Sequence, residues 1–175
     1  MENTIIYLIR HAETVVENGI RNTNEETQII NEKEILSVYG EEQSKKLSEN
    51  TELKNVDVIW SSSYTRAKAT AKYIANTNNL PINLDSNLNE RKLGNLKELG
   101  KFMKDKSTRD PSQEQLLDRN YKTSDGESAE DTRKRMNIFL NRILKEYEEN
   151  KIAVVSHRGS DKILFIKLVW SKWRG

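Results

Sequence analysis

The chain has 175 residues, which suits one domain with a single sizeable core. Its 29 Lys and Arg against 27 Asp and Glu leave a formal charge of +2, which argues against a dedicated nucleic-acid binder with its concentrated basic excess. Cysteine is absent, so disulfides, thiolate metal sites and cysteine nucleophiles are excluded.

Export and membrane signals are also missing from the sequence. No basic leader precedes an apolar stretch and a cleavage site at the N-terminus. Apolar runs are too short to span a bilayer. We therefore expect a cytoplasmic protein with no membrane partner.

The N-terminal half alternates strand and helix patterns. The apolar run Thr4–Ile9 predicts a first strand, and the helix-forming composition of Ser37–Asn50 predicts a helix after it. A second strand is expected at Val56–Trp60, followed by an Ala- and Lys-rich helix at Thr65–Asn76. A weaker strand is expected at Ile82–Leu84. Continuous Ile- and Val-rich runs are typical of strands covered on both faces, as in parallel sheets.

The C-terminal half opens with a polar, irregular segment from Gly94 to Asp125, which we interpret as an insertion over one edge of the sheet. Ala129–Glu148 predicts the clearest helix, followed by a strand at Ile152–Ser156 and a last helix at about Ser160–Trp170. Apolar residues of the clearest helix recur at spacings of three and four and are expected in the core: Met136, Phe139, Leu140, Ile143, Leu144 and Tyr147.

This alternation predicts the fold class. Strands joined through helices imply right-handed crossovers and a mainly parallel sheet with helices on both faces. We expect a three-layer α/β/α protein, with residues 1–175 forming one domain and residues of about 94–125 forming an insertion or lid.

Candidate chemistry gathers where the predicted strands end, the edge at which α/β proteins bind ligands. The only two histidines, His11 and His157, each directly follow a strand. Arg10 and Arg158 adjoin them, and Arg66 begins the helix after the second strand. A lone histidine after a strand is usually structural, but two at one edge beside arginines favour a functional site.

The arginines decide between a metal and an anion. A two-histidine metal site usually needs a third ligand, and neighbouring guanidinium groups would repel a cation, so we expect no metal and no cofactor. Guanidinium groups match phosphate oxygens, and their charge keeps a nearby histidine neutral and nucleophilic. The pattern indicates phosphoryl transfer through a histidine.

Six motifs in order make nearly the whole chain resemble the histidine phosphatase superfamily, in its phosphoglycerate mutase-like branch. They are Leu8–Thr14, Gly40–Gln43, Ser61–Ala67 with Thr70-Ala71, Leu88–Glu90 with Gly94, Gly126–Ser128, and Val154–His157. The resemblance implies a phosphoglycerate mutase-like fold.

The resemblance also implies catalytic roles. His11 would attack phosphorus and become phosphohistidine, while Arg10, Arg66 and His157 would hold the phosphoryl oxygens. Glu90 would protonate the leaving oxygen and then deprotonate the attacking water.

Thr14 and Arg158 are further substrate-binding candidates, and three positions depart from the motifs. Ala12 replaces the glycine after the nucleophile, and Ser63 replaces the proline usual before the second arginine. Arg158 replaces a glycine after His157 and puts bulk and charge beside the phosphate pocket.

The expected activity is hydrolysis of a small phosphate monoester, with a phosphorylated metabolite as the only partner; the sequence does not indicate an oligomeric state. Two alternatives remain open. A phosphoglycerate mutase-type transfer would need a larger lid than the insertion offers. A non-catalytic phospho-ligand binding module would not require Glu90.

Overall fold

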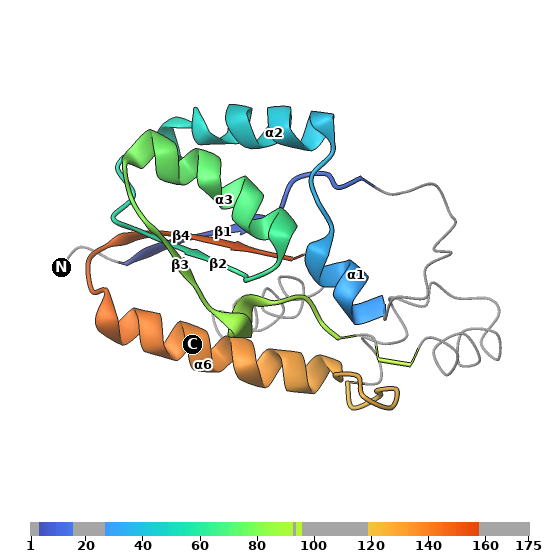
Figure 1. Ribbon diagram of the computed structural model, residues 1–175. Coiled ribbons are helices and arrows are strands. Elements are labelled where there is room, and N and C mark those ends of the chain that lie inside the picture. The colour runs from blue at the N-terminus through green and yellow to red at the C-terminus, as the bar shows by residue number, and fades with distance from the viewer. Residues whose placement is uncertain (1–3, 16–26, 93, 96–118, 158–175) are drawn as a thin grey trace.

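A computed structural model describes residues 4–15, 27–92, 94–95 and 119–157 (Figure 1). Its strands are β1 (Ile5–Arg10), β2 (Val58–Ser61), β3 (Ile82–Leu84) and β4 (Lys151–Ser156). They form one sheet in the order β1-β4-β2-β3, and every pair is parallel. The predicted parallel α/β fold is confirmed.

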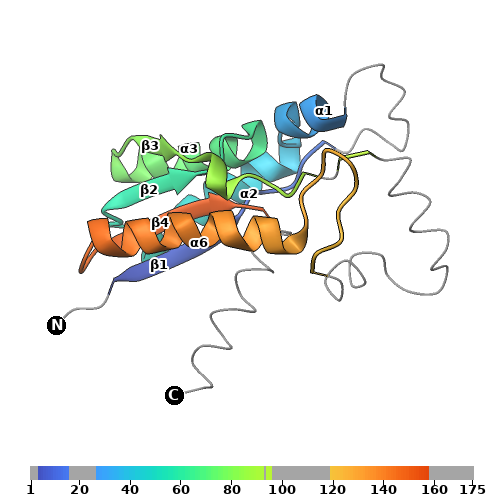
Figure 2. The ribbon, with the colours of Figure 1, turned by 90° about the horizontal axis from the view of Figure 1, so that it is seen from below.

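Helices cover both faces of this sheet. α2 (Val38–Ser48) and α3 (Thr65–Asn78) lie on one face, and α6 (Ala129–Glu146) crosses the other (Figures 1 and 2). α1 (Thr27–Lys33), which the sequence did not predict, lies near the carboxyl ends of the strands. Short 3₁₀ helices at Thr51–Leu53 and Ser86–Leu88 complete the described elements.

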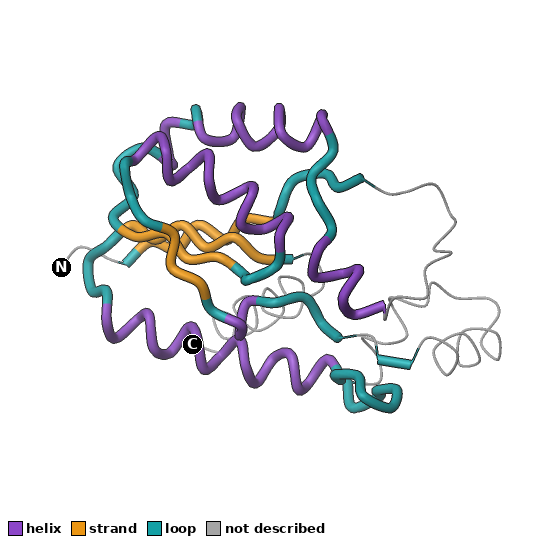
Figure 3. The backbone as a smooth tube through the Cα atoms, viewed as in Figure 1, coloured by secondary structure: helices purple, strands orange, loops and turns teal. Residues whose placement is uncertain are grey.

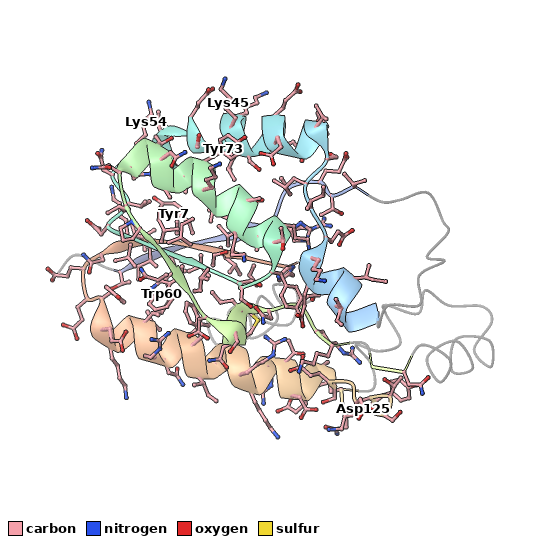
Figure 4. All side chains as sticks on the ribbon, viewed as in Figure 1. Tyr7, Lys45, Lys54, Trp60, Tyr73 and Asp125 are labelled. Atoms are coloured by element: carbon pink, nitrogen blue, oxygen red, sulfur yellow. The ribbon has the colours of Figure 1, made fainter. Side chains whose placement is uncertain are left out.

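The central strand β4 supplies both cores through its alternating side chains. Ala153 and Val155 pack toward α3, whereas Ile152 and Val154 pack toward α6, and all four are fully buried. This period of two is expected of a strand covered on both faces. Figure 4 shows the consequence, because Tyr7 lies on the α2–α3 side of the sheet and Trp60 on the α6 side.

The long helix α6 begins at a capping box, in which Ser128 and Asp131 each bond the other's backbone N–H. Its predicted apolar stripe is correct for Met136, Phe139 and Ile143, which are buried, while Leu140 and Tyr147 pack partly buried against them. Leu144 is a wrong assignment, since its side chain is 46% exposed. One residue after Ile143, the helix has turned by about 100° away from the core.

Several expectations lie outside the described residues. They include the last helix at 160–170, Arg158 and most of the 94–125 insertion. The single-domain assignment stays a prediction. Within the described ranges, no helix has the length and apolar character needed to cross a membrane.

Candidate active site

The paired strands β1 and β4 bring the two histidines together. Arg10 stands opposite Ser156 in the register, and the His11 N–H donates to the Ser156 carbonyl at 3.0 Å. The imidazole rings of His11 and His157 therefore lie with their centroids 5.1 Å apart. Figure 3 shows that the loops after β1 and β2 leave toward the end of the molecule where α1 lies.

Hydrogen bonds define the protonation state of His11. Its Nδ1 lies 2.7 Å from the Ala12 carbonyl oxygen, which can only accept, so Nδ1 carries the proton. Its Nε2 lies 3.1 Å from Nε of Arg66, which can only donate, so Nε2 presents its lone pair. His11 is therefore a neutral imidazole whose Nε2 is free of a proton, the form required of a nucleophile.

Burial is the largest cause of this neutrality. It lowers the pKa of His11 to about 4, against the opposing effect of the bond to Ala12, and the charges of Arg66 and Arg10 lower it further. The neutral form agrees with the expectation from the neighbouring arginine charges, which are not its main cause. The buried strand end contributes more, because desolvation disfavours the imidazolium.

The Arg66 guanidinium is held from behind by α1 and the residue after it. Its Nη1 donates to the Asn31 carbonyl, its Nη2 donates to Asn31 Oδ1 at 3.0 Å, and Glu34 forms an ion pair at 3.4 Å. Arg66 is only 3% exposed. Burial lowers its pKa, while the carboxylates of Glu34 and Glu90 raise it. Neither Asn31 nor Glu34 was a candidate from sequence, because their contact with Arg66 follows no local motif.

Thr14 and Arg10, both predicted to bind substrate, have different surroundings. The Thr14 hydroxyl donates to Glu34 Oε1 at 2.9 Å, so Thr14 supports the carboxylate that contacts Arg66. Arg10 is exposed, and its charge lowers the pKa of both His11 and His157, which places it near the two rings.

Glu90 lies in the loop after the 3₁₀ helix Ser86–Leu88. Its Oε1 accepts the Arg91 backbone N–H at 2.9 Å, and its charge raises the pKa of Arg66. The next two residues attach this loop to Glu127: Arg91 Nε donates to the Glu127 carbonyl at 2.7 Å, and the Lys92 N–H donates to its Oε2 at 3.0 Å.

Arg135 completes this attachment. Its Nε and Nη2 donate to the two carboxylate oxygens of Glu127 at 2.9 and 3.0 Å, a bidentate pair. The Glu127–Arg135 pair thus joins α6 to the loop that carries Glu90. The structure explains the Gly126–Ser128 motif, because Glu127 bonds both Lys92 and Arg135 and Ser128 caps α6.

His157 is completely buried. Its Nε2 lies 2.9 Å from the Ser62 hydroxyl, and the Tyr64 ring meets it edge-on with centroids 5.2 Å apart. In the part of the chain that the structure describes, His157 Nδ1 has no hydrogen-bond partner. Burial, then the charge of Arg66, lowers the pKa of His157 to about 2. A buried nitrogen without a partner normally marks a place for a ligand or water.

The backbone after His11 is held by two side chains and by the close approach of Gly40. The Ala12 N–H donates to Thr70 Oγ1 and the Glu13 N–H to Gln43 Oε1, both at 3.0 Å. A side chain at Gly40 would place its Cβ 2.0 Å from the Glu13 carbonyl oxygen. These contacts give Gly40, Gln43 and Thr70, all in motifs found from the sequence, a structural role beside the nucleophile.

Taken together, a buried arginine and two neutral histidines lie at the carboxyl edge of a parallel sheet, an arrangement whose chemistry suits an oxyanion such as a phosphoryl group. Among the residues described, no group of three or more His, Cys, Asp or Glu is placed to hold a metal ion.

Comparison with known families agrees with this class. Residues 6–172 match the model of the histidine phosphatase superfamily, branch 1, and the chain belongs to that superfamily. The resemblance seen in the six sequence motifs is thereby confirmed.

Solved structures with the same fold include three hydrolases. Mycobacterial hydrolase 2 has a TM-score of 0.77 at 22% identity, covering 96% of this chain and 73% of its own. The mycobacterial glucosyl-3-phosphoglycerate phosphatase Rv2419c, solved with inorganic phosphate, has a TM-score of 0.71 at 21% identity, covering 92% and 76%. The alpha-ribazole phosphatase of Shigella flexneri has a TM-score of 0.66 at 23% identity, covering 93% and 78%.

A curated relative matches part of the chain. The Schizosaccharomyces pombe protein named "Probable phosphatase C1620.13" is 36% identical over 91 residues. The match covers 51% of this chain and 30% of the yeast protein, well under two thirds of that protein's length.

Proposed function

We propose that this protein is a phosphatase that hydrolyses a small phosphate monoester through a phosphohistidine intermediate on His11. The observation that carries the proposal is the His11 ring itself, with Nδ1–H bonded to Ala12 and the Nε2 lone pair beside Arg66. A histidine held in this tautomer needs no base to become a nucleophile.

The first step transfers the phosphoryl group to the protein. When the ester binds, the Arg66 Nε–H moves from His11 Nε2 to a phosphoryl oxygen. Nε2 then forms a bond to phosphorus as the bond to the ester oxygen breaks, and protonated Glu90 gives its proton to that leaving oxygen. Arg66, Arg10 and His157 surround the phosphoryl oxygens and stabilise the charge that develops on them.

The second step releases phosphate. A water molecule attacks phosphorus, Glu90 takes the water proton, and the N–P bond breaks to return the lone pair to His11. Inorganic phosphate leaves, and Glu90 is again protonated for the next ester. One ester bond is thus exchanged for water with no other co-reactant.

Hydrolysis is favoured over mutase chemistry by the names of the similar proteins. Phosphatases recur among the fold relatives, and the curated relative is named as one. We propose a phosphorylated metabolite in the cytoplasm as the substrate. The Glu90 carboxylate, near enough to Arg66 to raise its pKa, supports catalysis over simple binding.

Hydrolysis of an aryl phosphate by the wild type and the His11→Ala variant, in buffer containing a chelator, tests the proposal. Tyr73→Phe is the matched control, because the hydroxyl of this partly exposed tyrosine on α3 donates a solvent-exposed hydrogen bond to Glu41 on α2. We expect turnover by the wild type and control and none by His11→Ala. Equal turnover by His11→Ala would contradict the proposal.

Glu90→Gln separates catalysis from binding. We expect this variant to bind inorganic phosphate as the wild type does while its turnover falls by about 10²-fold or more. A wild type that binds phosphate without any turnover would instead support the phospho-ligand binding module.

A further inference from the structure

The Ser62 hydroxyl lies within hydrogen-bond distance of three polar atoms, one of them on His157. It lies 2.8 Å from Asn89 Oδ1, 2.9 Å from His157 Nε2 and 3.2 Å from the Tyr64 backbone nitrogen, and Ser62 is fully buried. A hydroxyl has one proton to donate and two lone pairs to accept with. Its three neighbours therefore use its full capacity, and the direction of each bond can be worked out.

The backbone of Ser63 sets these directions. The Ser63 N–H can only donate, and it points at the Asn89 side chain at 3.0 Å, so the Asn89 atom there is the oxygen and not the amide nitrogen. This oxygen can only accept, so the Ser62 hydroxyl must donate its single proton to it. The Tyr64 N–H then donates to Ser62, and so must His157 Nε2.

His157 is thereby fixed with its proton on Nε2. In the neutral ring, Nδ1 carries a lone pair, and this is the buried atom with no partner among the described residues. His11 has the opposite tautomer, with the proton on Nδ1 and the lone pair on Nε2. The two rings at the site therefore both present a lone pair, and neither neutral ring has a spare N–H for a phosphate oxygen.

We propose that a phosphate group binds this site together with one proton, which is shared between His157 Nδ1 and a phosphoryl oxygen. The inference rests on the proposed function of the site. The proton arrives either on a monoanionic phosphate, as P–O–H donating to Nδ1, or from solvent, as Nδ1–H donating to a dianion. In both cases the hydrogen bond replaces the repulsion between a lone pair and an anionic oxygen.

The charges around His157 make this proton dependent on the ligand. Arg66 on α3, Arg135 on α6, and Arg10 and His11 after β1 all disfavour the imidazolium, and the Tyr64 ring covers its edge. A bound phosphate dianion supplies the opposite charge and reverses this balance at Nδ1. The site therefore takes up the proton when the anion arrives.

This arrangement depends on a departure from the family pattern. Ser63 occupies the position where the resembling motif has proline, and proline has no N–H to orient Asn89. Proline would also remove the Ser63 hydroxyl, which lies 3.0 Å from the same Asn89 oxygen, so neither donor would hold that oxygen toward Ser62. An Asn89 amide turned with its NH₂ toward Ser62 would make the Ser62 hydroxyl donate to His157 instead. Ser63 is thus inferred to be a positioning residue that acts on His157 through Asn89 and Ser62.

The ring nitrogens can be read directly by ¹⁵N NMR, because the chain has only two histidines and both are in the site. In the free protein we expect one ring protonated at Nδ1 and the other at Nε2. Addition of inorganic phosphate should protonate Nδ1 of the second ring or place it in a hydrogen bond, which shifts its resonance. A free His157 already protonated at Nδ1, or an Nδ1 resonance unchanged by bound phosphate, would overturn the proposal.

Calorimetry in buffers of different ionisation enthalpy counts the protons. At about pH 8.5, well above the second pKa of a phosphate monoester at about 6, we expect uptake of about one proton for each inorganic phosphate bound. Ser63→Pro should lower this number toward zero, whereas Ser63→Ala, which keeps the N–H, should leave it unchanged. Equal uptake by both variants would overturn the role of Ser63.

These readouts need no turnover, so they separate the inference from the proposed function. Phosphate binding without proton uptake in the wild type overturns the inference alone and leaves hydrolysis to be judged by its own assay. Absence of phosphate binding at millimolar concentration overturns both. His157→Asn, whose amide donates without a proton from solvent, should bind phosphate with no proton uptake.

Discussion

Arg66 donates its Nε–H to Nε2 of His11 over 3.1 Å. This bond fixes the direction of the His11 lone pair. It also keeps a guanidinium group beside the atom that would attack a phosphoryl group. The rest of the Arg66 fork is bonded to Asn31 and Glu34. The nucleophile is thus positioned through a chain of contacts that begins at α1.

Replacing Arg66 by Lys tests this geometry at constant charge. A single ammonium group cannot contact His11, Asn31 and Glu34 together, so the charge stays but the fork is lost. We expect kcat/KM to fall by about 10²-fold or more, the usual effect of removing one preorganised donor. Steady-state kinetics with an aryl phosphate and a thermal melt measure this; a loss below threefold in a stably folded variant would contradict the assigned role.

Gly40→Ala should damage the loop that follows the nucleophile. Alanine raises helix propensity by about 1 kcal/mol, but its Cβ would lie 2.0 Å from the Glu13 carbonyl oxygen, a backbone atom that cannot move aside alone. We expect the steric clash to outweigh the gain in helix propensity, so that the free energy of unfolding falls by roughly 1–3 kcal/mol and activity is reduced. Val38→Ala is the control, because this residue of the same helical turn is 81% exposed.

Urea denaturation and aryl phosphate kinetics check the glycine prediction. Val38→Ala should match the wild type in both. A Gly40→Ala protein as stable and as active as that control would show that the approach of α2 to Glu13 does not constrain the site.

Removing the Glu127 carboxylate should loosen the loop that carries Glu90. Glu127→Ala leaves Arg135 half-buried without its bidentate partner and frees the Lys92 N–H. We expect a loss of roughly 1–3 kcal/mol in unfolding free energy and a fall in kcat larger than any rise in KM. Glu130→Ala breaks a pair with Arg133, whose side chain is 33% exposed against 15% for Arg135, and should cost less than about 1 kcal/mol.

The Glu127 prediction fails if the two alanine variants lose equal stability, or if Glu127→Ala keeps full kcat. Either result would mean that the Glu90 loop is held by other contacts.

The buried histidines should make the fold sensitive to acid. Their pKa values are lowered to about 4 for His11 and about 2 for His157, whereas an unfolded histidine has a pKa of about 6.5. Below that pH the unfolded chain binds more protons than the folded one, so stability is lost as pH falls from about 6.5 toward about 4 and below.

Urea unfolding between neutral pH and about pH 4.5 measures this loss. His157→Asn should flatten the dependence by up to about 1.4 kcal/mol per pH unit, the contribution of one proton. Carboxylates titrate in the same window, but they are common to both proteins and cancel in the comparison. A variant with the same pH slope as the wild type would contradict the neutral state of His157.

Most of the helices and strands could be predicted from local patterns in the sequence. Continuous apolar runs indicated the strands, and apolar residues at spacings of three and four after Ser128 indicated α6, because burial on two faces or along one stripe leaves such a pattern in the sequence. α1 was missed since its seven residues, Thr27–Lys33, show no comparable stripe. Leu144 was assigned to the core because spacing alone cannot tell where a stripe turns outward.

Within the site, the order of motifs indicated His11, Arg66, Glu90 and His157. The residues that hold them were not visible, because these contacts join positions far apart in the chain. Asn31 meets Arg66 across 35 residues, and Ser62 meets His157 across 95. Of the residues around His157, Ser63 stood out in the sequence because it departs from the motif. The structure explains why this matters, because the Ser63 N–H points at Asn89.

The phosphohistidine intermediate on His11 can be trapped and identified. The wild type would be mixed with a phosphate monoester, quenched within one turnover in alkali, where phosphohistidine survives, and analysed by mass spectrometry of its peptides. We predict one phosphoryl group on the peptide that contains His11, longer-lived in Glu90→Gln and absent in His11→Ala. Turnover by the wild type with no phosphoryl group on His11, in the wild type or in Glu90→Gln, would contradict a phosphohistidine intermediate.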